Sequence, residues 1–241
     1  MKNTFTKIFI LAVLSVSLLT SSCRRFRPVH GSGVAGTEKR TVVSFSKIDV
    51  SGGLKVILTQ DSSSTVTVTA DDNLLKYIKT EIEGNKLHVY TTRNIQSQTQ
   101  VLISIGLKQL ESLEASGAVE VLSVGRITAK DLDLAFSGST NVDLDISAAD
   151  VHTDGSGSTE LKLKGQAASH HVTLSGSGDI DALDFVVGKY NIETSGASHC
   201  RINVLKDLEV HSSGSSEIEY RGHPTNVSSD KSGSASITPV N

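Results

Sequence analysis

Residues 172–183 read VTLSGSGDIDAL, in which two short runs of alternating apolar and polar residues flank a Ser-Gly pair. The same pair recurs through the second half of the chain at nearly constant spacing. Its glycines are Gly117, Gly138, Gly157, Gly176, Gly196, Gly214 and Gly233, separated by 21, 19, 19, 20, 18 and 19 residues. A period of about 20 residues that recurs this often is typical of a solenoid, in which each repeat forms one coil.

The residues around each Ser-Gly pair alternate in polarity. Four positions after the glycine every repeat has an apolar residue, and four positions before it most repeats do. These residues are Val121, Val142, Leu161, Ile180, Cys200, Ile218 and Ile237 after the glycine, and Leu113, Leu134, Val172, Ile192 and Val210 before it, with Thr153 and Ser229 as exceptions. Such alternation predicts two short strands per repeat, each with one buried face. Because about 20 residues leave no room for a helix, the sequence predicts an all-β parallel β-helix with coils of about 19–21 residues.

The seven glycines are interpreted as a structural corner. Where the wall of such a fold bends, each coil places one residue against identical residues of the coils above and below. Glycine tolerates both the positive φ and the close backbone approach that this bend requires, and serine hydroxyls bond readily in turns. We therefore expect the Ser-Gly pairs to lie along a single edge of the molecule.

The first residues, MKNTFTKIFILAVLSVSLLTSSC, have the pattern of a targeting segment. Two lysines precede an apolar run from Ile8 to Leu19, and that run is shorter than the roughly 20 residues that a helix needs to span a bilayer. We interpret residues 1–22 as a lipoprotein signal peptide. The ending LTSSC resembles a bacterial lipobox, so Cys23 is predicted to be the lipidated first residue of the mature chain.

Three further regions follow the signal peptide. Residues 23–40 are rich in Arg, Lys and Gly without an apolar period, and they are predicted to form a flexible basic tether, either lying on anionic headgroups or simply solvated. Residues 41–105 contain alternating strands and a short helical segment near 74–78, and they are predicted to cap the first end of the β-helix. Residues 106–241 form its regular coils. A separate small β domain over residues 41–105 is the alternative.

Composition limits the function classes. A nucleic-acid-binding protein needs a concentrated basic face. The formal net charge of this chain is −3, so nucleic acid is not expected as a partner. Aromatic residues make up only 4% of the chain and tryptophan is absent, so the core must be built from Val, Leu, Ile and Ala. With Cys23 bound to lipid, Cys200 is left alone and no disulfide framework is expected.

Several segments together resemble the putative auto-transporter adhesin head GIN domain family of Bacteroides-like envelope proteins. They are the lipobox, FSKIDVSGGLKVILTQ, ADDNLLKYI, GNKLHVYT and the chain of SGS and SGA corners, and the resemblance covers about residues 41–240. It implies a right-handed β-helical fold and a location in the cell envelope. It offers no catalytic motif to transfer to this chain.

Side chains at equivalent outward positions of successive coils are expected to stack in columns. Five positions after the glycine the charges alternate in sign. This column runs through Asp143, Lys162, Asp181, Arg201 and Glu219. The alternation predicts a ladder of surface ion pairs, each worth under about 1 kcal/mol, that keeps the coils in register.

The column three positions after the glycine is mainly acidic. It runs through Glu120, Asn141, Glu160, Asp179, His199 and Glu217. Like charges this close repel, and a cation or a cationic group of a partner would relieve the repulsion. The neighbouring Lys162 and Arg201 are the alternative source of relief. Glu160, Asp179 and Glu217 are therefore the candidate column for weak cation binding or for partner binding.

Two histidines, His152 and His171, fall at the same position of consecutive coils, with Asn191 next in the column and His170 beside them. A zinc site needs three or four protein ligands, and no third ligand is evident. We expect exposed, unligated histidines and no metal site.

Parallel β-helices also include polysaccharide lyases and hydrolases, and Asp179, Asp181 and Arg201 come nearest to such a site. Those enzymes build a groove from long loops to position the sugar. Here the spacing between coils varies by only three residues. No catalytic residue and no cofactor are therefore predicted.

The sequence thus favours a lipid-anchored cell-envelope protein of the adhesin or binding type, which presents a rigid β-helix to a glycan, a polymer or a protein. Its membrane contact is through lipidated Cys23, on the outer membrane. Because Arg24 and Arg25 follow the cysteine directly, the periplasmic face is slightly favoured over the exterior. The alternatives are an envelope polysaccharide lyase or hydrolase and a structural scaffold without a ligand.

Overall fold

The computed structural model describes residues 27–240, and the predicted signal peptide and Cys23 lie outside them. The prediction of an all-β fold is confirmed, because one short 3-10 helix is the only helical element among the described residues. The elements are β1 (Val29–His30), β2 (Ala35–Arg40), β3 (Lys47–Gly52), β4 (Lys55–Gln60), β5 (Thr65–Asp71), η2 (Leu75–Tyr77), β6 (Ile78–Glu83), β7 (Lys86–Thr91), β8 (Ile95–Gln96), β9 (Leu102–Leu107), β10 (Ser112–Thr128), β11 (Asp131–Arg221), β12 (Asn226–Gly233) and β13 (Ser236–Pro239).

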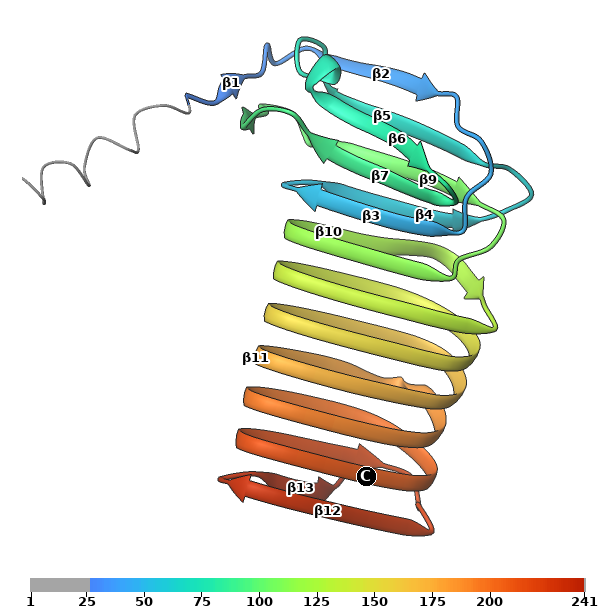
Figure 1. The fold of residues 1–241 in the computed structure, drawn as a ribbon, viewed down its shortest axis with the longest axis vertical. Coiled ribbons are helices and arrows are strands. Elements are labelled where there is room, and N and C mark those ends of the chain that lie inside the picture. The colour runs from blue at the N-terminus through green and yellow to red at the C-terminus, as the bar shows by residue number, and fades with distance from the viewer. Residues whose placement is uncertain (1–26, 241) are drawn as a thin grey trace, which may run out of the picture.

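Strands β10 to β13 wind through successive turns that lie on one another (Figure 1). β10 pairs with the start of β11 in parallel, and the register places Gly117 beside Gly138. At the other end the last part of β11 pairs in parallel with β12, with Gly214 beside Gly233. Strand β11 runs over 91 residues because the pairing between neighbouring coils continues through the corners, where glycines take positive φ values.

The corner glycines lie backbone against backbone. Gly176, for example, has φ +110°, and a Cβ atom built on it would lie 2.7 Å from the carbonyl oxygen of Gly157 and 3.1 Å from its nitrogen. The same contact recurs from coil to coil, so the glycines do line up along one edge. Gly52 of the SGG segment at 51–53, which precedes the seven corner glycines and is followed by Val56 and Leu58 at the spacing of the later coils, pairs with Gly117 and begins the column.

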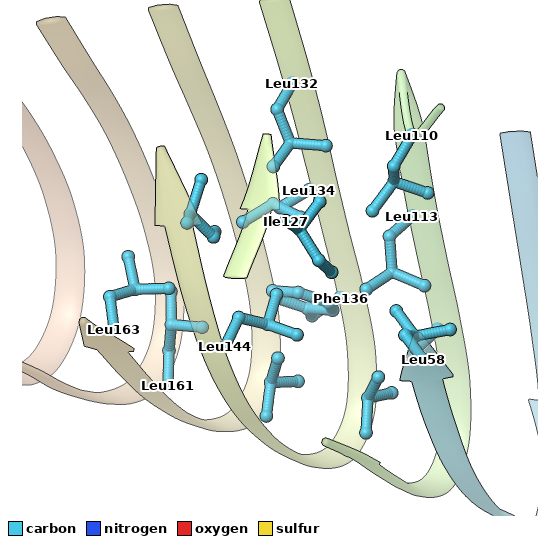
Figure 2. Close-up of a cluster of buried hydrophobic side chains, with 14 of the residues drawn as sticks. Leu58, Leu110, Leu113, Ile127, Leu132, Leu134, Phe136, Leu144, Leu161 and Leu163 are labelled. Carbon is cyan, nitrogen blue, oxygen red and sulfur yellow. The ribbon is translucent and has the colours of Figure 1, made fainter. Parts of the chain in front are cut away.

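The inward positions predicted from the alternation are buried. Leu113 and Leu134 on one wall and Leu144 and Leu161 on the other point into the space between the walls (Figure 2). Of the seven apolar residues four positions after the glycine, six are fully buried, and only Ile237 in the last coil is half-buried. The two exceptions before the glycine differ from each other, because Thr153 is buried and Ser229 is exposed.

Small residues next to the corner leave room for one large side chain. A Cβ atom built on Gly155 or on Gly178 would lie 2.7 or 2.8 Å from the methyl groups of Leu174. Gly155 belongs to the preceding coil and Gly178 to the corner of the coil that contains Leu174, so the leucine fills space that two coils share. Close packing of this kind means that a change at one position is felt at the others.

Residues 41–105 extend the stack and then change its character. β3 and β4 pair with β10 in parallel, β7 pairs with β3 in parallel, and β9 pairs with β4 in parallel. Beyond them β2 with β5, β5 with β9 and β6 with β7 are antiparallel. The sheet is therefore mixed, and the helical segment expected near 74–78 is present as η2.

The expectation of a flexible tether over residues 23–40 was wrong for its second part. Residues 29–30 form β1, which pairs with β8, and residues 35–40 form β2, which pairs with β5 along its whole length. The pattern was missed because β2 reads AGTEKR and buries no large apolar side chain. Its partner strand and backbone hydrogen bonds hold it in place, and composition does not reveal either.

Among residues 27–240 no helix has the length and the apolar character needed to cross a membrane.

Replacing Gly176 with valine should unfold the coils at lower denaturant concentration. A branched side chain at φ +110° would meet the backbone of Gly157, and we expect a loss of several kcal/mol in the free energy of unfolding, as is typical when backbone strain and overpacking combine. Chemical denaturation measures it. Ser177→Val, at the exposed neighbouring position, is the control and should change stability by less than about 0.5 kcal/mol. Equal stability of the two variants would contradict the corner assignment.

Candidate functional site

The corner forms an exposed edge of small residues that runs along the coils. A serine precedes the glycine in every coil from Gly52 to Gly233, and through the central coils the serine, the glycine and the residue after it are all exposed. We call this the corner edge, residues Ser-Gly-Ser or Ser-Gly-Ala of each coil. Because its side chains are small, the corner edge is flat, and the side chains on its two flanks decide what can bind there.

One flank carries the column that the sequence analysis singled out. Glu160, Asp179 and Glu217 all line a single open groove of about 710 Å³, together with His199. The other lining residues are mostly serines of the corner edge and of the positions next to it, with Ser234 and Ser236 at the last coil. The structure therefore brings the three predicted residues together along one surface.

The charges of this column are not equally compensated. Glu160 lies 3.0 Å from the ammonium group of Lys162 and also accepts a hydrogen bond from the amide of Asn141. Asp179 has only the imidazole of His199, at 4.0 Å. Glu217 has no hydrogen bond or ion pair with any described residue. Two carboxylates of the groove are thus left for an outside partner.

The alternating column five positions after the glycine forms a ladder only in part. The guanidinium of Arg201 lies 2.6 Å from Asp181, as the alternation predicts. Lys162 instead turns to Glu160 on its own strand, and Asp143 is 3.7 Å from Lys164. The hydrogen bond and charge of Glu160 raise the pKa of Lys162. Lys162 therefore reduces the repulsion between Glu160 and the other acids of the column, which is the alternative given in the sequence analysis.

The opposite flank of the corner edge is also acidic. It holds two further open grooves, of about 450 and 350 Å³, which are lined among others by Asp154, Glu193 and Asp230. None of these three carboxylates has an ion pair with a described residue, whereas Glu114 on the same flank lies 2.7 Å from Lys86. The sequence analysis missed this second column, although counting three positions back from each glycine would have shown it.

The described residues contain no group of three His, Cys, Asp or Glu side chains placed to hold a metal ion. The carboxylates of the flanks belong to different coils and point outward side by side. They can each accept a hydrogen bond or an ion pair from an amine or guanidinium group, which needs only one or two oxygens at a time. This arrangement suits an extended partner better than a single ion.

His170 does not lie on the surface as expected. It is 1% exposed, its Nε2 lies 2.9 Å from the hydroxyl of Thr153, and its ring packs against Phe185 and Tyr190. The prediction of exposed histidines is therefore wrong for His170. Burial, together with the charges of His152 and His171, lowers its pKa to about 3. The polar exception at Thr153 is explained, because its hydroxyl pairs with the Nε2 atom of this buried ring.

The other two histidines of the group lie near each other. The ring centroids of His152 and His171 are 5.1 Å apart, and His171 is in hydrogen-bond range of the Thr173 hydroxyl. No third ligand accompanies them among the described residues.

Asp181 and Cys200 could also take part in a reaction, but one is paired and the other is buried. Asp181 is bound by Arg201, and the Cys200 thiol is fully buried in the core. Burial, with a smaller contribution from the charge of Asp179, raises the pKa of Cys200 to about 12, so the thiol is not a nucleophile at neutral pH. The geometry of the corner edge and its flanks therefore supports binding.

The stacked coils, the flat corner edge and the open polar grooves on its flanks define an all-β repeat protein. The family model described as "Putative auto-transporter adhesin, head GIN domain" matches residues 44–224, and the chain belongs to that family. No curated protein matches the sequence.

Solved structures of Bacteroides-like bacteria share the fold. A "putative adhesin" of Bacteroides fragilis has a TM-score of 0.83 and 21% identity over 88% of this chain and all of its own. A "putative adhesin" of Parabacteroides merdae has a TM-score of 0.68 and 20% identity, covering 88% of this chain and 99% of that one. A "putative lipid binding protein" of Parabacteroides distasonis has a TM-score of 0.67 and 22% identity, covering 89% and 100%. At these identities the likeness is one of fold.

The buried imidazole should make stability fall on acidification. In the unfolded chain His170 titrates near its ordinary value of 6.5, but in the folded chain its pKa is about 3. Its contribution is therefore complete above pH 6.5 and is lost as the pH falls from 6.5 toward 3, at up to about 1.4 kcal/mol per pH unit. Urea denaturation at pH 7, 6, 5 and 4 measures the slope.

His170→Gln keeps a hydrogen-bonding group for Thr153. It removes one titrating group, so the slope should fall by up to about 1.4 kcal/mol per pH unit. His223→Gln, at an exposed histidine, should leave the slope as in the natural sequence. An unchanged slope in His170→Gln would show that this ring is not buried.

Proposed function

We propose that the chain is a lipid-anchored envelope protein of the adhesin type, whose coils form a right-handed parallel β-helix that presents the corner edge to an extended partner. Membership in the adhesin family and the parallel registers along the corner support the class. The anchor is Cys23, through the lipobox-like LTSSC, and the envelope is the location. The outer membrane is the proposed site of anchoring, with the periplasmic face favoured.

One observation carries the choice of the corner edge as the contact surface. Asp179 and Glu217 on one flank and Asp154 and Glu193 on the other have no Lys or Arg partner among the described residues, whereas Glu120 and Glu160 of the first flank are paired with Lys55 and Lys162. Unpaired carboxylates on both sides of a flat serine-lined strip attract positive charge and offer many hydrogen-bond acceptors. The partner is therefore a glycan, polymer or protein segment that carries amino or guanidinium groups along its length.

An extended partner also fits the repeat. Equivalent residues of neighbouring coils are about 4.8 Å apart, so Asp179 and Glu217, two coils apart, are separated by about 10 Å along the corner edge. A polyproline II segment has three residues per turn and rises about 3.1 Å per residue, so basic side chains three residues apart lie on one face and about 9 Å apart, close to that separation. The serine hydroxyls between them can bond the backbone or the sugar hydroxyls of the partner.

A polysaccharide lyase or hydrolase is the other function weighed from the sequence. Asp181, one of its three candidate residues, is paired with Arg201. Asp179, the remaining carboxylate, lies in an open groove beside serines. No described feature favours the enzyme over the binding protein. Release of sugar products from a polysaccharide by the purified chain would support the enzyme instead.

Neutralising the flanks should weaken binding. Surface plasmon resonance with the mature chain immobilised, and with an oligolysine peptide and a chitosan oligomer as probes, measures the affinity. We expect micromolar binding that weakens with salt, and at least a tenfold loss for Asp179→Asn combined with Glu217→Gln. Asp131→Asn, at an exposed acid that is not among the lining residues of the three grooves, is the control and should bind normally. Binding of neither probe, or equal binding by all variants, would overturn the assignment.

Anchoring is tested separately. An alkyne-labelled palmitate fed to the producing cells should be incorporated into the chain, and detergent-phase partition should retain it. Cys23→Ser should abolish both the label and the partition, whereas Cys200→Ser should change neither, because that thiol is buried. Label that persists in Cys23→Ser would contradict the lipid anchor.

A further inference from the structure

The N-terminal strap, residues 29–34, is held against the body almost entirely by hydrogen bonds. The N–H of Val29 donates to the carbonyl of Asn94, and the N–H of Gly31 donates to the carbonyl of Gln96, at 2.8 and 2.9 Å. Val34 is 60% exposed, and no apolar side chain of the strap enters the core cluster. The strap can therefore leave the body without opening the hydrophobic core.

A single buried carboxylate joins the strap to a loop of the body. Asp71, at the end of β5, is fully buried. Its oxygens accept hydrogen bonds from the hydroxyl of Ser97 at 2.7 Å, the N–H of Gln98 at 2.7 Å, the hydroxyl of Thr99 at 3.2 Å and, on the strap, the N–H of Gly33 at 3.1 Å. A buried carboxylate is tolerated only with such a set of donors, and its removal leaves those donors without a partner.

The strap fits against Asp71 without spare space. A Cβ atom built on Gly31 would lie 1.8 Å from the Oδ2 atom of Asp71, so only glycine can pass at this point. The amide of Gln98 donates to the carbonyl of Gly31 at 2.9 Å.

Asn73 adds a second set of polar contacts. Its amide nitrogen donates to the carbonyl of His30, and its amide oxygen accepts from the N–H of Ser32, both at 2.9 Å. Every residue of the strap from Val29 to Val34 thus has at least one hydrogen bond to the body.

We propose that the strap detaches from the body when tension acts on the N-terminus, and that the hydrogen bonds of Asp71 hold it in place until then. We call the strap in this role the latch. The role rests on the anchoring at Cys23 proposed above. Between Cys23 and Val29 lie five residues, which span at most about 17 Å when extended. With the strap released as far as β2, eleven residues connect the anchor to the body and span at most about 37 Å. Opening therefore roughly doubles the maximum length of the segment between the proposed anchor and the body.

The strands next to the strap make it the first element to yield. β1 pairs with β8 over only two residues, whereas β2 pairs with β5 over six. Tension applied at the N-terminus reaches the two-residue pairing and the Asp71 contacts before it reaches β2. The coils, which are held by long parallel ladders and a continuous core, carry the load after the latch has opened.

Hydrogen exchange measured by NMR on the mature chain tests the latch without any membrane. In Asp71→Asn the N–H groups of Val29, Gly31 and Gly33 should exchange at least tenfold faster than in the natural sequence, while the amides of the coils keep their rates. Gly31→Ala, which removes the space for the strap by a different route, should have the same effect. Gly53→Ala, at a glycine with no atom within 4 Å of an added Cβ, is the matched control.

Unchanged exchange of the strap in both variants would overturn the proposal, and so would loss of the whole fold in both, because the strap would then belong to the core. Single-molecule pulling between the N- and C-termini gives an independent reading. A first step of about 20 Å, for the six residues released, should precede the unfolding of the coils and be absent from Asp71→Asn. A chain that shows this step but no lipid on Cys23 would keep the latch and lose the anchor.

Discussion

The structure depends on the close contact between glycine backbones at the corner. From coil to coil the α-carbon of one glycine faces the carbonyl oxygen and the nitrogen of the next, and a Cβ atom would come within 2.3–2.8 Å of that oxygen. Glycine is the one residue type that tolerates both this close approach and a φ near +90 to +130°. Once the corner is fixed at each repeat, the register of both walls follows, and so does the assignment of every side chain to the core or to the surface.

Much of this could be read from the sequence, because the corner uses one residue type and the walls have a period of two. The column from Gly117 to Gly233 and the buried rows on both sides were predicted in that way. The place of His170 was not, since its neighbours Thr153, Phe185 and Tyr190 come together only in the folded core. The strap was taken for a tether because its bonds run to Asp71 and to residues 94–98, far away in sequence.

The candidate site, too, was predicted from the sequence only in part. The acidic column of Glu160, Asp179 and Glu217 was found by counting from the glycine, because outward side chains of a regular repeat must stack. Which of its charges is free could not be predicted, since that depends on side-chain direction: Lys162 turns toward Glu160 and leaves Asp179 and Glu217 open. The proposed binding of an extended partner rests on these carboxylates, which lack a Lys or Arg partner and lie along one edge of a regular backbone.

The central claim is that the Ser-Gly pairs of successive coils lie side by side, and disulfide cross-linking tests it most directly. Ser116 lies beside Ser137 in the parallel register, which places their α-carbons within the range that a disulfide can bridge. Cysteines at 116 and 137 should cross-link fully under mild oxidation in the folded chain, whereas cysteines at 116 and 156, two coils apart, should not. Cross-linking of 116 with 156 as readily as with 137, or with neither, would contradict the account.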